Sequence, residues 1–132
     1  MLTIDLSSPV PLTDQIYAGL RGAIARGELS PGDPLPTVRQ LAGDLTISLN
    51  TVSRAYQFLE RDGLIAAVRG RGTVVVNNQQ TKRPRAEVRR QLKQQARDLL
   101  ANAAIAGWDY RQVASLLKEE ARAYARHSPG GA

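Results

Sequence analysis

Side chains able to form paired hydrogen bonds recur along the segment TISLNTVSRAYQFLE, residues 46–60. At about 100° per residue, four of them in and just after this segment fall on one helix face: Asn50, Arg54, Gln57 and Arg61. No carboxylate shares that face. In the major groove of DNA, an amide side chain can bridge two atoms of adenine and a guanidinium two atoms of guanine. The alternative is a solvated helix face, which is common on any globular protein.

The other side of the same segment is apolar and predicts a helix that packs on a core. Its apolar side chains recur at the spacing i, i+3, i+4 and i+7: Val52, Ala55, Tyr56 and Leu59. Ser48 is the expected N-cap, and Gly63 is the expected end of the helix. The polar face is therefore expected to point away from the core.

Two helices are expected before this one. The first spans residues 11–26 and stops at Gly27, and the second spans residues 37–45. Thr37 and Gln40 have the spacing of a capping box. SPGDPLP, between these helices, has the composition of a turn. Because only about four residues separate the second and third helices, the pair is typical of a helix-turn-helix.

A β-hairpin is expected directly afterwards, in LIAAVRGRGTVVV, residues 64–76. Two apolar, partly β-branched runs flank the glycine-containing segment RGRG. A nucleotide-binding glycine loop would lead into a helix, whereas this one leads into an apolar strand. Three helices followed by a hairpin predict a winged helix.

The last third of the chain predicts a helical hairpin. Residues 78–83 are polar and aperiodic, and form the expected linker. One helix is expected from Pro84 to a break at Gly107, and a second helix, capped by Asp109, up to the tail HSPGGA. Such a hairpin is too small to bury a stable core by itself, so a second copy of the chain is the expected partner. The predicted domains are residues 1–77, a winged helix-turn-helix, and residues 84–132, a dimerisation hairpin.

The composition excludes several functional classes. The 132 residues include no cysteine, which removes disulfides, thiolate zinc sites and thiol nucleophiles. His127 is the only histidine and lies in the expected tail, so no catalytic, metal or cofactor-binding residues are predicted, and no enzyme. No apolar run reaches the ~18 residues of a membrane span, and the N-terminus has no signal-peptide pattern. We expect a cytoplasmic protein without membrane contact.

The positive charge is concentrated in the C-terminal part. The net charge is +6, but residues 1–77 hold seven basic and seven acidic residues, whereas residues 78–132 hold eleven and five. Seven Lys and Arg face one Glu within residues 82–97. We interpret this run as a solvated helix face rather than a direct contact with DNA.

The segment LPTVRQLAGDLTISLNTVSRAYQFLERDGLIAAVRGRGTVV, residues 35–75, resembles the DNA-binding domain of GntR-type bacterial transcription regulators. The resemblance covers residues 10–76. The short C-terminal part is similar to the YtrA-type subgroup, whose members lack a large effector-binding domain and dimerise through these helices. The resemblance implies a mainly α fold with a small β-hairpin, in which a winged helix-turn-helix is followed by a two-helix dimerisation hairpin.

The resemblance also implies which residues contact DNA. In the family the N-terminal part of the third helix enters the major groove, which places Asn50, Thr51 and Arg54 at the bases. Gln57 lies further along and is expected to reach phosphate or water. Leu49 departs from the pattern, because the subgroup often has proline there and other subgroups often have an arginine that contacts DNA.

Phosphate and minor-groove contacts are expected from two other elements. Arg39, in the first turn of the second helix, matches an arginine that contacts DNA in relatives, and a helix N-terminus favours phosphate. At the tip of the hairpin, Gly70 and Gly72 would allow a close approach, with Arg69 and Arg71 reaching the minor groove or the backbone.

Together these patterns and the resemblance predict a homodimeric transcription regulator that binds a palindromic double-stranded operator, and the resemblance alone implies that it is a repressor. The alternative is a dimerising adaptor for other proteins, built on a winged helix that no longer reads DNA. Leu49 and the neutral charge balance of residues 1–77 favour this alternative. A small-molecule effector, if there is one, would have to enter between the hairpin and the winged helix, and no residue identifies it.

Overall fold

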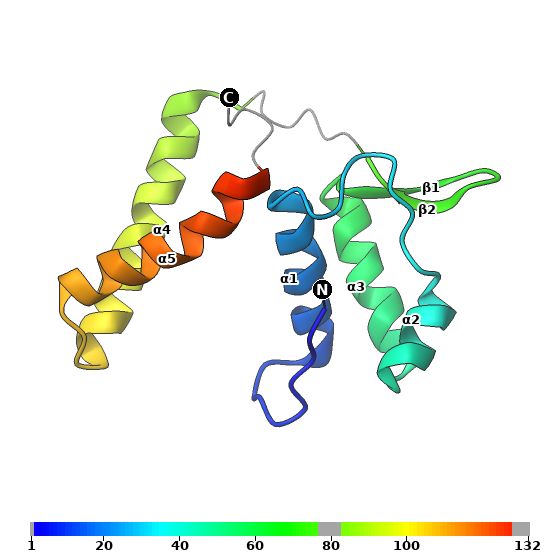
Figure 1. The fold of residues 1–132 in the computed structure, drawn as a ribbon, viewed down its shortest axis with the longest axis horizontal. Coiled ribbons are helices and arrows are strands. Elements are labelled where there is room, and N and C mark those ends of the chain that lie inside the picture. The colour runs from blue at the N-terminus through cyan, green and yellow to red at the C-terminus, as the bar shows by residue number, and fades with distance from the viewer. Residues whose placement is uncertain (1, 77–82, 128–132) are drawn as a thin grey trace. The chain divides into compact units, whose positions relative to one another are not determined.

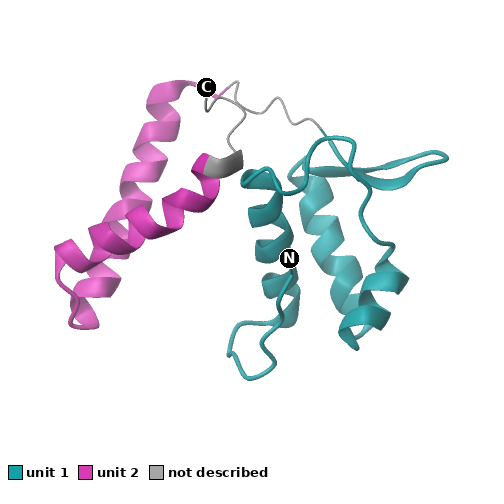
Figure 2. Cartoon of the chain, viewed as in Figure 1, with its two compact units in different colours: residues 1–78, 127–132 teal, residues 79–126 magenta. Residues whose placement is uncertain are grey.

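The computed structural model describes residues 2–76 and 83–127 of the chain. The chain forms two compact units (Figure 2). The first comprises residues 1–78 and 127–132, and the second comprises residues 79–126. The predicted linker at 78–83 and the predicted tail at 127–132 lie outside the described residues, except for Arg83 and His127.

Three helices form most of the first unit: α1 (Leu12–Ala25), α2 (Val38–Leu45) and α3 (Leu49–Arg61) (Figure 1). Their ends lie within two residues of the predicted ones. Gly27 (φ 82°) and Gly63 (φ 74°) follow the C-caps of α1 and α3 in the left-handed conformation. Both predicted stops are therefore confirmed, since glycine adopts this conformation without a steric penalty.

Side-chain caps fix the start of both helices of the helix-turn-helix. The Thr37 hydroxyl accepts a hydrogen bond from the Gln40 amide (3.0 Å), and the Gln40 side chain accepts one from the Thr37 amide (2.9 Å). Ser48 caps α3 as predicted. The connection between α2 and α3 turns at Thr46, which has a φ of 56°. The sequence did not indicate this residue, because β-branched side chains rarely adopt positive φ.

The wing is an antiparallel hairpin of β1 (Ile65–Val68) and β2 (Gly72–Val75). Ile65 pairs with Val75, and Val68 pairs with Gly72. The loop between them is closed by a hydrogen bond from the Arg71 amide to the Val68 carbonyl (2.9 Å). This confirms the predicted hairpin.

A short segment after α1 lies along β2 and widens the wing. The Gly32 amide donates to the Val75 carbonyl (2.8 Å), and the Leu35 amide donates to the Thr73 carbonyl (2.9 Å). The prolines of this segment indicated only a turn. Proline has no amide hydrogen, but the hydrogen bonds to β2 come from Gly32 and Leu35, which stand between the prolines.

The core of the first unit is aliphatic, with one aromatic ring from Tyr56. α3 packs against α1, α2 and β1, and its whole predicted apolar face is buried. These elements, together with Leu35 before α2 and Val75 of β2, supply the core residues, which are Ile16, Leu20, Leu35, Leu41, Ala42, Val52, Ala55, Tyr56, Leu59, Ile65 and Val75. This packing fixes the rotation of α3, so its polar face must point outward.

The second unit is a pair of helices, α4 (Arg85–Ile105) and α5 (Tyr110–His127). Gly107 (φ 88°) ends the first helix. Asp109 precedes the second and accepts a hydrogen bond from the Arg111 amide (2.6 Å). Within the described part of this unit, Val113 is the one buried large hydrophobic residue. Most of its apolar surface is therefore exposed in the single chain.

The stability of the first unit should decrease with rising pH in the alkaline range because of Tyr56. Its hydroxyl donates to the Pro36 carbonyl (2.7 Å), and burial raises its pKa from 10.0 to about 12. Because the folded state holds this proton more tightly, the contribution to stability is complete below about pH 10 and is lost towards pH 12. The free energy of unfolding should therefore fall over this range. Urea titrations near pH 8 and near pH 11 measure the fall.

The matched variant is Tyr56→Phe, which lacks the titrating hydroxyl. Its free energy of unfolding should be about 1 kcal/mol lower near neutral pH, because the hydrogen bond is missing. Between pH 8 and pH 11 its free energy of unfolding should fall less than that of the wild type. Tyr17, whose pKa is also raised through its hydrogen bond to Asp62, remains in this variant and accounts for part of the residual fall. An equal fall in both proteins would contradict the assignment to Tyr56.

Candidate nucleic-acid interface

The polar face of α3 is exposed as the sequence predicts. Asn50, Arg54 and Gln57 are exposed, and no hydrogen bond or ion pair engages their side chains within the described residues. Arg61 differs, because its guanidinium lies over the ring of Phe58, 5.0 Å from the ring centroid. Three of the four polar side chains are thus available for a ligand.

Thr51 is held within the protein. Its hydroxyl lies 2.8 Å from the Ser48 hydroxyl, and its amide donates to the Ser48 hydroxyl (3.1 Å). Its carbonyl accepts a hydrogen bond from the Thr13 hydroxyl of α1 (3.2 Å). The half-buried Thr51 therefore ties the first turn of α3 to α1, which places Asn50 firmly. Sequence patterns could not identify Thr13, because its hydrogen-bond partner is a backbone carbonyl 38 residues away.

Phe58 packs inside the first unit. Its ring meets the ring of Tyr17 edge to face, at 82° and with the centroids 6.2 Å apart. Tyr17 in turn donates a hydrogen bond to Asp62 just after α3. This cluster anchors the C-terminal end of α3 to α1, so both ends of the helix are fixed.

Arg39 lies in the first turn of α2, next to its capping box. The side chain is exposed and has no ion-pair partner in the part of the chain that the structure describes. The Thr37 and Gln40 side chains bond two backbone amides at this helix end. A guanidinium beside a helix N-terminus is suited to a phosphate group.

The wing tip carries the other four predicted residues. Arg69, Gly70, Arg71 and Gly72 are all exposed. Gly70 (φ 81°) and Gly72 (φ 73°) adopt positive φ, and a Cβ at either position would meet no atom within 4 Å. Glycine is therefore required by the backbone conformation and not by crowding. Arg69 and Arg71 stand on either side of Gly70, which has no side chain.

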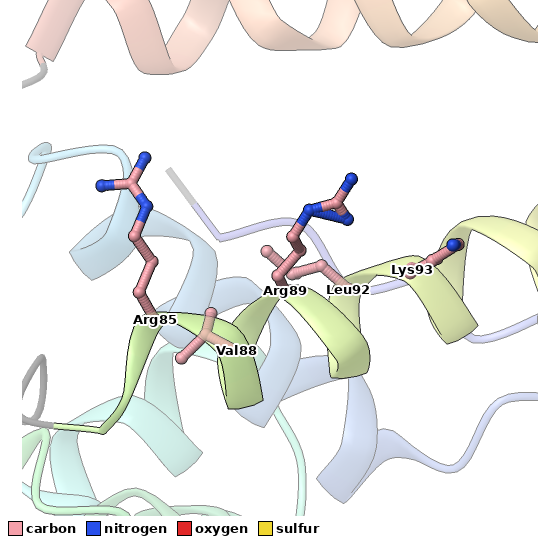
Figure 3. Close-up of a pocket in the computed structure, with 5 residues that line it drawn as sticks. All are labelled: Arg85, Val88, Arg89, Leu92 and Lys93. Atoms are coloured by element: carbon pink, nitrogen blue, oxygen red, sulfur yellow. The ribbon is translucent and has the colours of Figure 1, made fainter.

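The basic run on α4 has its own geometry. Arg85, Val88, Arg89, Leu92 and Lys93 lie along one side of the helix (Figure 3). Figure 3 shows the guanidiniums of Arg85 and Arg89, one turn apart, extending to the same side. Arg83, just before the helix, forms an exposed ion pair with Glu87 (3.2 Å). Nothing in this arrangement selects DNA over water.

The described residues also bear on metal binding and on membrane insertion. Among residues 2–76 and 83–127, no group of His, Cys, Asp and Glu side chains is arranged to hold a metal ion. No helix in these ranges is both long and apolar enough to span a membrane.

The chain is similar over nearly its whole length to a known regulator. It is 36% identical to the HTH-type transcriptional repressor YtrA of Bacillus subtilis over 119 residues, which are 90% of this chain and 91% of that protein. Residues 12–75 match the family described as bacterial regulatory proteins, gntR family. The matched residues include α1, α2, α3 and the wing.

Solved structures share the fold. The crystal structure of a transcriptional antiterminator from Listeria monocytogenes EGD-e has a TM-score of 0.78 and 25% identity, and covers 94% of this chain and 92% of that one. YtrA from Sulfolobus acidocaldarius, a GntR-family transcription factor, has a TM-score of 0.55 and 38% identity, and covers 70% and 97%. The winged helix-turn-helix and the mainly α fold are thus confirmed. The chain belongs to the GntR family, and it is a DNA-binding transcription regulator and not an enzyme.

Proposed function

We propose that the protein is a repressor that binds a palindromic operator as a homodimer, each protomer placing α3 in a major groove. The observation that carries this proposal is the two-sided character of α3. Its apolar face is fully used by the core, whereas Asn50 and Arg54 stand exposed and unpaired within the described residues. An exposed amide and guanidinium one helical turn apart match the hydrogen-bonding edges of adenine and guanine.

The contacts are divided between bases and backbone. Asn50 and Arg54 bond to base edges, and Thr51 holds the first turn of α3 at the bases beside them. Gln57 lies one turn beyond Arg54 and bonds to phosphate or to water at the bases. Phosphate contacts of this kind set the register of a protein on the duplex without reading sequence.

The remaining contacts come from α2 and the wing. Arg39 bonds to a phosphate near the start of α2. Arg69 and Arg71 reach the backbone or the minor groove, with Gly70 and Gly72 allowing the tip to come close. These arginines add affinity that weakens with salt, because each phosphate contact releases counterions.

Dimerisation belongs to residues 84–132, with residues 1–77 binding DNA and residues 78–83 joining the two. The exposed large apolar side chains of the second unit are Leu92, Leu100, Ile105, Trp108, Tyr110, Leu116, Leu117 and Tyr124. A monomer seldom exposes so much apolar surface on so small a unit. A second copy packed on the same helices would bury it with two-fold symmetry.

Repression and the cellular location are inferred from relatives and from the proposed DNA binding. A relative with 36% identity is named a transcriptional repressor, which supports repression over activation here. Residues 12–75 match a family of bacterial regulatory proteins, and bacterial DNA lies in the cytoplasm, so we place the protein there. Repression would follow from the blocking of polymerase at the operator.

Footprinting against genomic fragments tests the proposal. We expect one or more protected sites with two-fold symmetry, whose half-sites lie about 10 bp apart or at a multiple of it, one helical turn of B-DNA. Protection without two-fold symmetry would contradict the homodimer. Protection of all fragments alike would contradict sequence-specific binding.

A further inference from the structure

We infer that Leu49 is a specificity residue, and that it packs on the C5 methyl group of a thymine in each half-site. The inference rests on the proposed DNA binding and adds to it the identity of one base pair. Leu49 is the first residue of α3, directly before Asn50. An apolar side chain cannot bond to a base edge, but thymine is the one base that presents a methyl group in the major groove.

The exposure of Leu49 sets it apart from the core leucines. Leu49 is 47% exposed, whereas Leu59 on the same helix is 0% exposed. Of the exposed large apolar side chains in the described part of the chain, Leu49 is the one that lies on α3. The core therefore does not account for a leucine at this position.

The place of Leu49 is fixed by its neighbours. Ser48, immediately before it, caps α3, and Thr51 is bonded both to Ser48 and to α1. Leu49 thus sits on a turn held at both ends, and it has little freedom to fold back onto the core. A fixed and half-exposed leucine can bury apolar surface on a ligand at a small entropic cost.

Asn50 determines which base pair lies next to Leu49. An Asn that bridges adenine N6 and N7 reads an A·T pair, and every A·T pair carries a thymine methyl in the same groove. The Cα atoms of adjacent residues are about 3.8 Å apart, close to the ~3.4 Å rise of one base-pair step. The methyl that Leu49 meets therefore belongs to the pair that Asn50 reads or to the next one.

Replacement of thymine by deoxyuridine tests this contact, because it removes the methyl and keeps the base pairing. The probe is a synthetic duplex with the footprinted sequence, in which each thymine is replaced in turn in both half-sites. One methyl is worth about a fourfold change in Kd, so a symmetric pair should weaken wild-type binding by about fifteenfold. This effect should occur at one thymine position of the half-site, beside the adenine read by Asn50.

The variants separate this contact from a general loss of binding. Leu49→Ala should bind the thymine and uracil duplexes equally, whereas Leu49→Met, which keeps an apolar chain, should keep part of the difference. Leu6→Ala is the matched control, because Leu6 is an exposed leucine (77%) of the same unit outside α3, and it should keep the full difference. Circular dichroism verifies that all three variants are folded.

Two results would overturn the inference. One is a wild-type protein that is insensitive to uracil at every thymine, and the other is a Leu49→Ala variant as sensitive as the wild type. Either result leaves the footprint, and with it the proposed function, intact. A wild-type protein that protects no specific sequence would instead reject the proposed function itself, and this inference with it.

Discussion

Replacement of Arg54 by alanine is expected to remove most of the selectivity for the operator. Arg54 is exposed on α3 and has no partner within the described residues, so its guanidinium is free to bridge two atoms of guanine. Each such pair discriminates by about 1–3 kcal/mol, and a dimer makes it twice. The ratio of Kd for a scrambled duplex to Kd for the footprinted duplex should fall by a factor between about 30 and about 10⁴. Titration of both duplexes at one salt concentration measures this ratio.

Arg89→Ala is the matched control for the lost positive charge. Arg89 is an exposed arginine on α4, in the run that we interpret as a solvated face. It should leave the selectivity ratio unchanged, since a phosphate contact would affect both duplexes alike. An unchanged ratio in Arg54→Ala would contradict a base contact by Arg54. A ratio near one in the wild-type protein would favour the alternative function, a dimerising adaptor that does not read DNA. A fall in affinity for both duplexes with Arg89→Ala would show that the basic run touches DNA.

The helices could be predicted from the sequence because their signals are local. In α3 the apolar period, the Ser48 cap and the Gly63 stop all act within 16 residues, and each is confirmed. The pairing of residues 32–35 with β2 could not be predicted, because the prolines of this segment obscure it and its partners are about 40 residues away. The turn at Thr46 could not be predicted either, because the tight connection imposes its positive φ, which a β-branched side chain does not favour.

The polar face of α3 could be predicted from the helical period, but its availability could not. Arg61 looks equivalent to Arg54 on a helical wheel, yet its guanidinium lies over Phe58, whose ring is held by Tyr17 of α1. Thr51 looks free in the sequence, yet Ser48 and Thr13 hold it. Side chains on a helix become distinguishable only when the neighbouring helices are in place. The contacts of these residues with DNA stay predictions.

Placement of a carboxylate at Leu117 is expected to separate the proposed dimer. Leu117 lies on α5 and is 51% exposed in the single chain, and other large apolar residues of this unit are also exposed. In a two-fold dimer the Leu117→Glu change occurs twice and places unpaired charge in the interface. A cost of about 3 kcal/mol or more corresponds to at least a hundredfold rise in the dimer Kd. Sedimentation velocity over a range of concentrations measures this rise.

Ser115→Glu is the control, because it adds the same charge to α5 on the side opposite the apolar stripe, and it should leave the dimer intact.

Loss of the dimer should also weaken binding to the operator. A monomeric Leu117→Glu variant keeps α3 unaltered, so it should still bind one half-site weakly but lose the gain from binding two half-sites together. Two results would contradict the assignment of dimerisation to these helices: an unchanged dimer Kd in Leu117→Glu, or a wild-type protein that is monomeric at every concentration. A variant that separates into monomers yet protects both half-sites as strongly as the wild type would show that the operator, and not the second unit, brings the protomers together.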